Sequence, residues 1–271
     1  MQATGNNQNQ SYILSIRLRA DGLSFYGCNT AQAGQVAIEH YPYAGRTAVE
    51  TLRQALDRSP MLRECDSPTT YALTDSPSMQ VPLECFRKED VHTLYRLTYA
   101  QEKTGKTYYN ILPHLEVAQI FTVDPETEHL LRLAFPGIRF YHSHSMILEK
   151  LWLLQRQDTP KTLYACFDGN QAFLFCYKEQ KLQYANTFPA DKADNAAYFL
   201  LSVWKGLGLD AGEDTCVLAG RGEAKDETAL RLERFLPHVR NTEATDIFRR
   251  SALARNPQVP FDLLALLVHV I

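Results

Sequence analysis

Two histidines separated by one residue, His142 and His144, are a pair of side chains whose spacing suggests chemistry. In a strand, this spacing turns both imidazoles to one face, where they would begin a metal site. No third ligand is evident in the sequence, and Ser143 or Ser145 suits the cap of a helix starting here. We therefore interpret the histidines as solvated residues at the junction of a strand and a helix.

The six cysteines could act as nucleophiles or form disulfides. The six cysteines are scattered without a Cys-x-x-Cys motif, at Cys28, Cys65, Cys85, Cys166, Cys176 and Cys216. Four of them lie in apolar, strand-like runs, which favours buried free thiols in a reducing compartment over disulfides. Cys166 and Cys176 fall in predicted central strands, where a thiol is usually inert.

Two short stretches of the chain are rich in acidic residues. Residues 64–66 and 223–227 are both expected to be solvated loop segments, with Asp226 as a candidate helix cap.

The elements that must position these residues belong to a chain of ordinary globular composition. Of 271 residues, 45% are hydrophobic, 11% aromatic and 22% charged, with a formal net charge of −3. The low charge and the lack of a Lys/Arg block give no electrostatic reason to expect nucleic acid or an anionic membrane as partner. Residues 1–10 are expected to be a disordered tail, and the apolar segment 261–271 a packed helix too short to span a membrane. We expect a cytoplasmic protein.

Between residues 161 and 241, hydrophobic periodicity predicts three strands, a helix, a strand, a helix and a last strand. The expected strands span 161–168, 171–177, 182–188, 214–219 and 238–241. The expected helices span 191–206 and 226–236. Gly169-Asn170 is a turn signal between the first two strands, as in a β-hairpin.

Both of these helices have an apolar face for a core. In the first helix that face carries Ala197, Leu200, Leu201 and Trp204. In the second helix the residues available for the core are Leu230, Leu232 and Phe235.

The first half of the chain begins in the same order. Its expected elements are strands 12–18, 23–28 and 36–41, helix 47–56 and strand 69–73. An additional block, 81–123, then contains a strand-like 81–86, a helix 88–99 and strands 108–112 and 116–123. The order resumes with helix 125–135, strand 138–141 and helix 143–155. Two halves that share one order suggest a duplicated domain with an insertion in the first copy.

The inserted block is rich in tyrosine. Its aromatic series is Tyr95, Tyr99, Tyr108 and Tyr109. These side chains form either the core of a small subdomain or an exposed patch for a protein partner, and the sequence leaves both interpretations open.

This element order resembles the actin-like ATPase superfold, in which two ribonuclease H-like domains face each other across a nucleotide cleft. The resemblance implies an α/β fold with two tandem domains, each a mixed sheet flanked by helices, and an inserted α+β subdomain in the first. The insertion resembles that of pilus-assembly and type II secretion members. The implied domains are 11–157, with the insertion at about 81–123, and 158–271.

Short motifs carry a closer resemblance. They are Val81-Pro82-Leu83 with Phe86 before a helix, Asn186-Thr187-Phe188 followed by Asp194 and Tyr198-Phe199-Leu200-Leu201, and Leu207-Gly208-Leu209-Asp210 leading to Leu218-Ala219-Gly220. Over roughly residues 11–241 they resemble a bacterial family known as domain of unknown function 3822. Because that family has no established activity, the resemblance implies a fold and not a reaction.

In active members of the superfold, two strand-turn-strand hairpins present backbone amides and an aspartate to phosphates and Mg²⁺. The resemblance therefore implies a nucleotide cleft near Asp21, Gly22, Asp168, Gly169, Gly220, Arg221 and Gly222. ATP and Mg²⁺ are the cofactors that such a cleft would take.

The motifs themselves are degraded. The first hairpin, 15–22, has no acidic residue inside its first strand, and Asp21-Gly22 suits a turn for conformational reasons alone. Asp168-Gly169 is followed by Asn170 rather than by small residues, so we interpret it as a hairpin turn as well. Arg221 interrupts a glycine pair, where it either occludes a nucleotide or contacts an anion.

The residues leave two functions open. The first is a catalytically degenerate actin-like protein that acts as a binding or scaffolding module, with a protein partner at the inserted subdomain. The alternative is a weak Mg²⁺-dependent ATPase or phosphotransferase that uses Asp168, with Asp21, Gly169 and Gly220 supporting its cleft.

Overall fold

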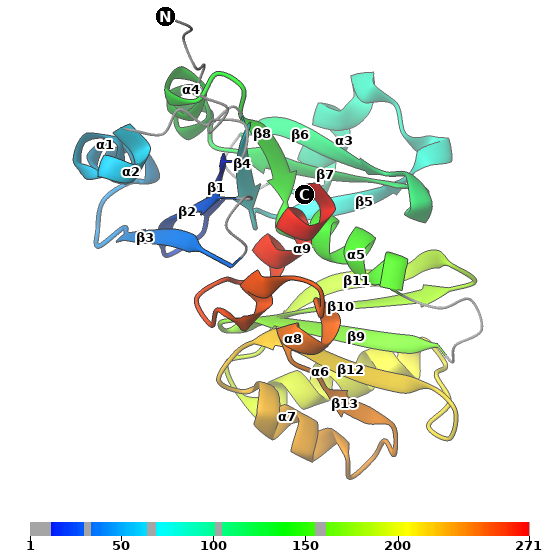
Figure 1. Ribbon diagram of the computed structural model, residues 1–271. Helices are drawn as coiled ribbons and strands as arrows, with labels where there is room; N and C mark the ends of the chain where they lie inside the picture. The colour runs from blue at the N-terminus through cyan, green and yellow to red at the C-terminus, as the bar shows by residue number, and fades with distance from the viewer. Residues whose placement is uncertain (1–11, 30–33, 64–68, 101–104, 155–160, 271) are drawn as a thin grey trace, which may run out of the picture. The chain divides into compact units, whose positions relative to one another are not determined.

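A computed structural model describes residues 12–29, 34–63, 69–100, 105–154 and 161–270, and it divides into two compact units (Figure 1). The first unit contains the described residues up to Leu112 and Val117–Met146, and the second contains Pro113–Glu116 and Ile147–Val270. The division falls between Met146 and Ile147, whereas we expected a boundary after residue 157, which lies outside the described residues. The predicted tail 1–10 and Cys65 also lie outside them.

The first unit contains a five-stranded mixed sheet in the order β3-β2-β1-β4-β8. Its strands are β1 (Tyr12–Leu18), β2 (Gly22–Asn29), β3 (Val36–Pro42), β4 (Thr69–Thr74) and β8 (Arg139–His142). The first three form an antiparallel meander, and β4 and β8 continue the sheet in parallel with β1. Helices α1 (Ala48–Arg58) and α4 (Pro125–Ala134) bury Leu52 and Leu131 against Leu14 and Ile16 of β1. The short helix α2 (Pro60–Arg63) follows α1.

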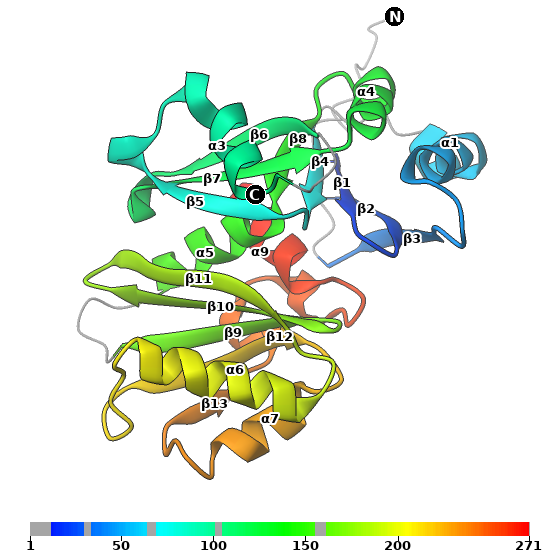
Figure 2. The same cartoon turned by 180° about the vertical axis from the view of Figure 1, so that it is seen from behind.

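The second unit contains a sheet with the corresponding order, β11-β10-β9-β12-β13. Its strands are β9 (Thr162–Asp168), β10 (Gln171–Lys178), β11 (Lys181–Pro189), β12 (Thr215–Arg221) and β13 (Val239–Asn241). Figure 2 shows α6 (Ala193–Gly206) and α7 (Lys225–Leu232) on one face of this sheet. Leu200 and Trp204 of α6 are buried there with Leu232 of α7. The remaining helices are α5 (Ser143–Leu154), α8 (Ala244–Ile247) and α9 (Phe261–Val270).

A second, three-stranded sheet in the first unit has the order β5-β7-β6. Its elements are β5 (Ser78–Pro82), β6 (Lys106–Leu112), β7 (Val117–Val123) and the helix α3 (Val91–Thr98). The strand-like segment predicted at 81–86 is displaced, because the observed strand β5 ends at Pro82. Residues Leu83–Cys85 instead form a 3₁₀ turn, because Pro82 cannot donate to a strand ladder.

The tyrosines of this region belong to its core and its internal contacts. Tyr95 is buried with Val81, Val91 and Ile120, and Tyr99 and Tyr109 pack against that cluster. The hydroxyl of Tyr95 donates to the carbonyl of Pro77 at 3.0 Å, and that of Tyr99 donates to the carbonyl of Ser78 at 2.6 Å. Tyr108 packs against the core beneath α1 and α4. The structure therefore favours the core interpretation over an exposed aromatic patch.

Two residues predicted for the core face of the helix at 226–236 are exposed to solvent instead. Leu230 of α7 is 64% exposed, and Phe235, which lies three residues beyond the end of α7, is 63% exposed. The buried positions are Lys225, Thr228, Ala229 and Leu232, whose spacing of three and four residues defines the inner stripe of the helix. Most residues of that stripe are small or polar. The positions of large apolar side chains therefore did not predict the buried face correctly.

The described thiols are free, and four of the five are buried. Burial raises the pKa of Cys28 and of Cys176 to about 11 and that of Cys216 to about 12, so these side chains stay protonated. Cys85 is free and exposed. Among the described helices, none is long and apolar enough to cross a membrane.

The side chain of Asn110 joins the two sheets of the first unit. Its Oδ1 accepts from the backbone N–H of His142 and from the hydroxyl of Ser145, each at 2.9 Å. Its Nδ2 donates to the carbonyl of Phe140 at 3.2 Å. Asn110 is buried, so β6 is held beside β8 and the start of α5 by three hydrogen bonds shielded from water.

We expect Asn110→Leu to destabilise the protein by about 2–4 kcal/mol, because it removes these bonds and leaves buried backbone groups without partners. Urea unfolding measures the effect. Asn195→Leu is the matched control, since Asn195 is exposed on α6, and it should cost less than about 0.5 kcal/mol. Equal losses in the two variants would contradict the role of Asn110.

A second polar group, the Glu128 cluster, joins α4 to β6 around one buried carboxylate. It consists of Glu128, Lys106, Tyr108 and Arg132. Lys106 Nζ donates to Glu128 Oε1 at 2.8 Å, Tyr108 donates to the same oxygen at 2.5 Å, and Arg132 Nε donates to it as well. Burial alone would raise the pKa of Glu128, but the three hydrogen bonds outweigh it and hold the pKa at about 2.

The free energy of unfolding should therefore depend on pH through Glu128. Since the folded pKa lies below the ordinary value of 4.5, its stabilisation is complete above about pH 4.5 and is lost as the pH falls toward 2. The amount is about 3 kcal/mol. Chemical unfolding from pH 6 to pH 3 should show a steep loss in the wild type and a flatter profile in Glu128→Gln. Parallel profiles would contradict this assignment.

Candidate functional site

The predicted site residues fall in two corners, one in each unit. In the first unit, Asp21 lies in the turn between β1 and β2, and Gly22 is the first residue of β2. The N–H of Arg19 donates to the carbonyl of Gly22 at 3.1 Å, and the N–H of Tyr43 donates to the carbonyl of Asp21 at 3.0 Å. A Cβ on Gly22 would lie 2.7 Å from the carbonyl oxygen of Tyr41 on β3. Gly22 is therefore explained by the close approach of the neighbouring strand.

An ion pair that we did not predict lies beside this turn. Arg19 Nη1 is 3.1 Å from Asp75 Oδ2, and both side chains are largely buried, at 20% and 23% exposed. Arg19 directly follows β1 and Asp75 directly follows β4, at the carboxyl ends of two parallel strands. This end of an open α/β sheet is the usual place for a ligand. Leu18 lies opposite Thr74 in the register of β1 and β4, which brings the next residues, Arg19 and Asp75, together. Knowledge of this register would have been needed to predict the ion pair.

The electrostatics of the corner are set by burial and by carboxylates. Burial raises the pKa of Tyr43 to about 12, with the negative charges of Asp75, Asp21 and Asp124 acting in the same direction. Tyr43 is therefore a neutral phenol near neutral pH.

His142 is not the solvated residue that we predicted. Its side chain is fully buried at the end of β8. Its Nδ1 accepts from the backbone N–H of His144 at 3.2 Å, so Nε2 carries the hydrogen that is donated to the carbonyl of Ser76 at 2.9 Å. Both ring nitrogens are used, which leaves neither of them for a metal ion.

His144 is partly buried at the start of α5, with its ring centroid 4.6 Å from that of His142. Burial holds the pKa of His144 well below its ordinary value, and the neighbouring His142 ring and the positive charge of Arg19 act in the same direction. His144 is therefore neutral near neutral pH. Ser145 donates to Asn110 and is committed to that junction. Within the described ranges, no group of three or more His, Cys, Asp or Glu side chains could hold a metal ion.

In the second unit, the predicted residues come together where β9 and β12 end. Arg221 lies opposite Asp168 in the parallel register, and the N–H of Gly169 donates to the carbonyl of Arg221 at 3.0 Å. Gly220 has a φ of +80°, and a Cβ there would lie 2.2 Å from the carbonyl oxygen of Phe167. A Cβ on Gly222 would lie 2.7 Å from the carbonyl oxygen of Gly169. The two glycines therefore allow the chain to approach itself.

The side chain of Arg221 contacts its own unit. Its Nη2 lies 3.4 Å from the carbonyl oxygen of Asn256, and this is an exposed contact. Asp168 is half-buried at the end of β9. Gly169 differs from Gly220, because its φ is +59° and nothing lies within 4 Å of an added Cβ.

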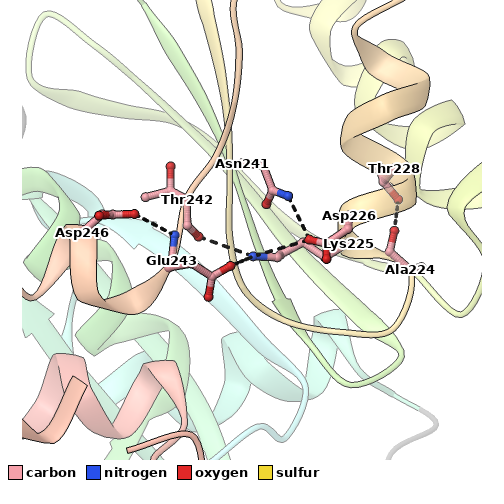
Figure 3. A network of polar contacts seen from close by, with 8 residues as sticks. All are labelled: Ala224, Lys225, Asp226, Thr228, Asn241, Thr242, Glu243 and Asp246. Atoms are coloured by element: carbon pink, nitrogen blue, oxygen red, sulfur yellow. Dashed lines mark hydrogen bonds and ion pairs between the residues drawn. The ribbon is translucent and has the colours of Figure 1, made fainter. Parts of the chain in front are cut away.

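Next to this corner, a buried lysine corrects the expectation that residues 223–227 are a solvated loop (Figure 3). The side chain of Lys225 is only 5% exposed, and its Nζ is 2.9 Å from Glu243 Oε1 and 3.9 Å from Asp226 Oδ1. It also lies 3.5 Å from the carbonyl oxygen of Thr242. The lysine therefore links the start of α7 to the start of α8.

Asp226 does not act as a helix cap. It lies inside α7, whose N-cap is Ala224 without a side-chain hydrogen bond. Its carboxylate accepts from Nδ2 of Asn241 at 2.8 Å, which ties α7 to the end of β13.

These architectural features match known structures. A crystal structure of a Bacteroides thetaiotaomicron VPI-5482 protein with an actin-like ATPase fold and unknown function superposes with a TM-score of 0.81. The identity is 24%, over 98% of this chain and 99% of that chain. The PilM-PilN type IV pilus biogenesis complex contains a chain with a TM-score of 0.54 and 12% identity, over 96% and 98% of the two chains. The fold is therefore that of the actin-like ATPases.

The family is defined by sequence. Residues 2–239 match the family described as "Protein of unknown function (DUF3822)", and the chain belongs to that family. No curated protein matches the chain. Membership establishes the family, and no specific function is established by it.

The steric account of the second corner predicts that Gly220→Ala is far more damaging than Gly169→Ala. The first change combines a left-handed backbone with a clash on Phe167 and should cost more than about 3 kcal/mol. The second has a left-handed backbone but open space, and it should cost about 1–2 kcal/mol. Thermal and urea unfolding of both variants measure the difference. Similar costs would contradict the assignment of Gly220 to chain packing.

Proposed function

We propose that this protein is a catalytically degenerate member of the actin-like fold that serves as a binding or scaffolding module. The observation that carries the proposal is the Arg19–Asp75 ion pair. A Mg²⁺ ion is held by carboxylates that bear full negative charge. Here the guanidinium of Arg19 neutralises Asp75 and places a positive charge where a cation would have to enter.

The second corner supports the same proposal. A phosphate loop needs glycines that leave backbone N–H groups open to an anion. The N–H of Gly169 is already donated to the carbonyl of Arg221, and Gly220 and Gly222 lie so close to Phe167 and Gly169 that a Cβ at either position would clash. Packing of the chain on itself therefore accounts for the glycines of this corner.

The proposal includes a duplicated origin with an insertion. The two five-stranded sheets share one order, third-second-first-fourth-fifth, when each is numbered from its own first strand. Between the fourth and fifth strands the second unit has only α7, whereas the first has α4 and also β5, α3, β6 and β7. The additional elements correspond to the insertion, and we place the binding surface for a protein partner there. The PilM-PilN neighbour is itself a complex, which supports such a role.

A reducing compartment is also part of the proposal. Four buried thiols are free, which suits the cytoplasm.

A second candidate function is a weak Mg²⁺-dependent ATPase or phosphotransferase that uses Asp168. The observation in its favour is the open space around Gly169, next to a half-buried carboxylate. In this alternative, Asp168 would hold Mg²⁺ or activate a nucleophile.

Thermal unfolding with millimolar ATP and Mg²⁺ separates the two functions. We expect no change in Tm for the wild type. A nucleotide present at 100 times its Kd would stabilise the protein by about 2.7 kcal/mol, which corresponds to a shift of several degrees. Such a shift would contradict the degenerate-fold proposal. If it appears, Asp168→Ala should abolish it, whereas the exposed Asp57→Ala on α1 should not.

A further inference from the structure

The Glu128 cluster in the first unit contains more donors than its carboxylate oxygen can accept. Lys106, Tyr108 and Arg132 all donate to Oε1 of Glu128. The ammonium of Lys106 carries three N–H donors and the guanidinium of Arg132 carries five, so contact with one oxygen of Glu128 uses only part of each group.

The cluster also contains more positive than negative charge. Lys106 and Arg132 contribute two positive charges, and Glu128 contributes one negative charge. The Glu128 side chain is 6% exposed, whereas those of Lys106 and Arg132 are 54% and 40% exposed. The negative charge is thus buried, and the two cationic groups lie toward solvent. The net charge of these three groups is +1.

Aromatic rings hold both cations in place. The Arg132 guanidinium carbon is 5.1 Å from the centroid of the Phe140 ring and 6.0 Å from that of Tyr108. Lys106 Nζ is 5.8 Å from the centroid of the same Tyr108 ring. Arg132 Nη2 also donates to the Tyr108 hydroxyl at 3.0 Å. Cations that are already positioned lose less conformational entropy when they bind an anion.

An exposed ion pair elsewhere in the chain has a different composition. Lys181 and Glu116 are 2.8 Å apart in the second unit, and both are about two-thirds exposed. In this pair one cation meets one carboxylate. Neutralising Glu128 would likewise require only one of its two cations.

From the donor excess and the outward charge, we propose that Lys106 and Arg132 form a binding site for one singly charged oxyanion. The anion accepts from Lys106 Nζ and from the Arg132 guanidinium on their solvent side, while Glu128 keeps the two cations together from beneath. A carboxylate or a phosphate group has the required chemistry. This site lies outside both hairpin corners and is independent of the function proposed for them.

The test is a titration of the full-length protein with sodium phosphate and, separately, with sodium acetate, against sodium chloride of equal ionic strength. The side-chain NMR signal of Arg132 Nε–H reports binding. We expect a saturable shift with at least one of the two anions and none with chloride. Saturation by phosphate alone would identify a phosphate source, and saturation by acetate would identify a carboxylate source. A linear, chloride-like response to both anions would overturn the proposal.

A pair of lysine variants separates the site from general surface charge. Lys106→Gln should weaken the apparent affinity about tenfold or more, because it removes one charge-assisted hydrogen bond. Lys181→Gln removes an equally paired and similarly exposed lysine, and it should leave the affinity unchanged. Both lysines are at least half exposed, so both variants should fold. Unchanged affinity in Lys106→Gln, or equal losses in the two variants, would overturn the proposal.

Discussion

The amide of Asn110 is the constraint on which the first unit depends. A strand of the small sheet ends beside a strand of the large one, and among the described strands no ladder of backbone hydrogen bonds joins β6 to β8. The side chain of Asn110 supplies an acceptor and a donor in place of that ladder, and it binds the backbone of β8 at both Phe140 and His142. Because an amide carries both functions in one plane, neither aspartate nor leucine of similar size could replace it. The start of α5 is fixed by the same oxygen through Ser145.

In the two hairpin corners, as at Asn110, polar groups of the chain interact with other groups of the same chain. In the first corner a carboxylate at the end of β4 finds a guanidinium at the end of β1. In the second corner, glycines at 220 and 222 let backbone atoms of β12 and of the turn after β9 come into contact. Polar groups of both corners are thereby engaged within each unit. A fold shared with ATPases does not by itself imply their reaction, because a function depends on its site rather than on the sheets.

The order of strands and helices along the chain could largely be predicted from sequence, since alternation and apolar spacing are local properties. Examples are the meander around Gly169-Asn170 and the helix predicted at 191–206 and found at Ala193–Gly206. Contacts between distant segments could not be predicted in this way. Arg19 meets Asp75 only through a parallel register, and Lys225 becomes buried only because Glu243 and Thr242 return to it from beyond β13. The burial of His142 has the same origin, since its partner Ser76 lies 66 residues away.

The phenols of α3 have a further consequence for how this protein meets other chains. β5 is an edge strand of the small sheet, and such an edge can recruit a strand from another molecule and begin aggregation. Tyr95 and Tyr99 donate to the carbonyls of Pro77 and Ser78, where that edge begins. Pro82, which has no N–H to offer, ends the five-residue strand. The edge is therefore short and blocked at both ends, which limits the addition of a strand from another molecule to the small sheet.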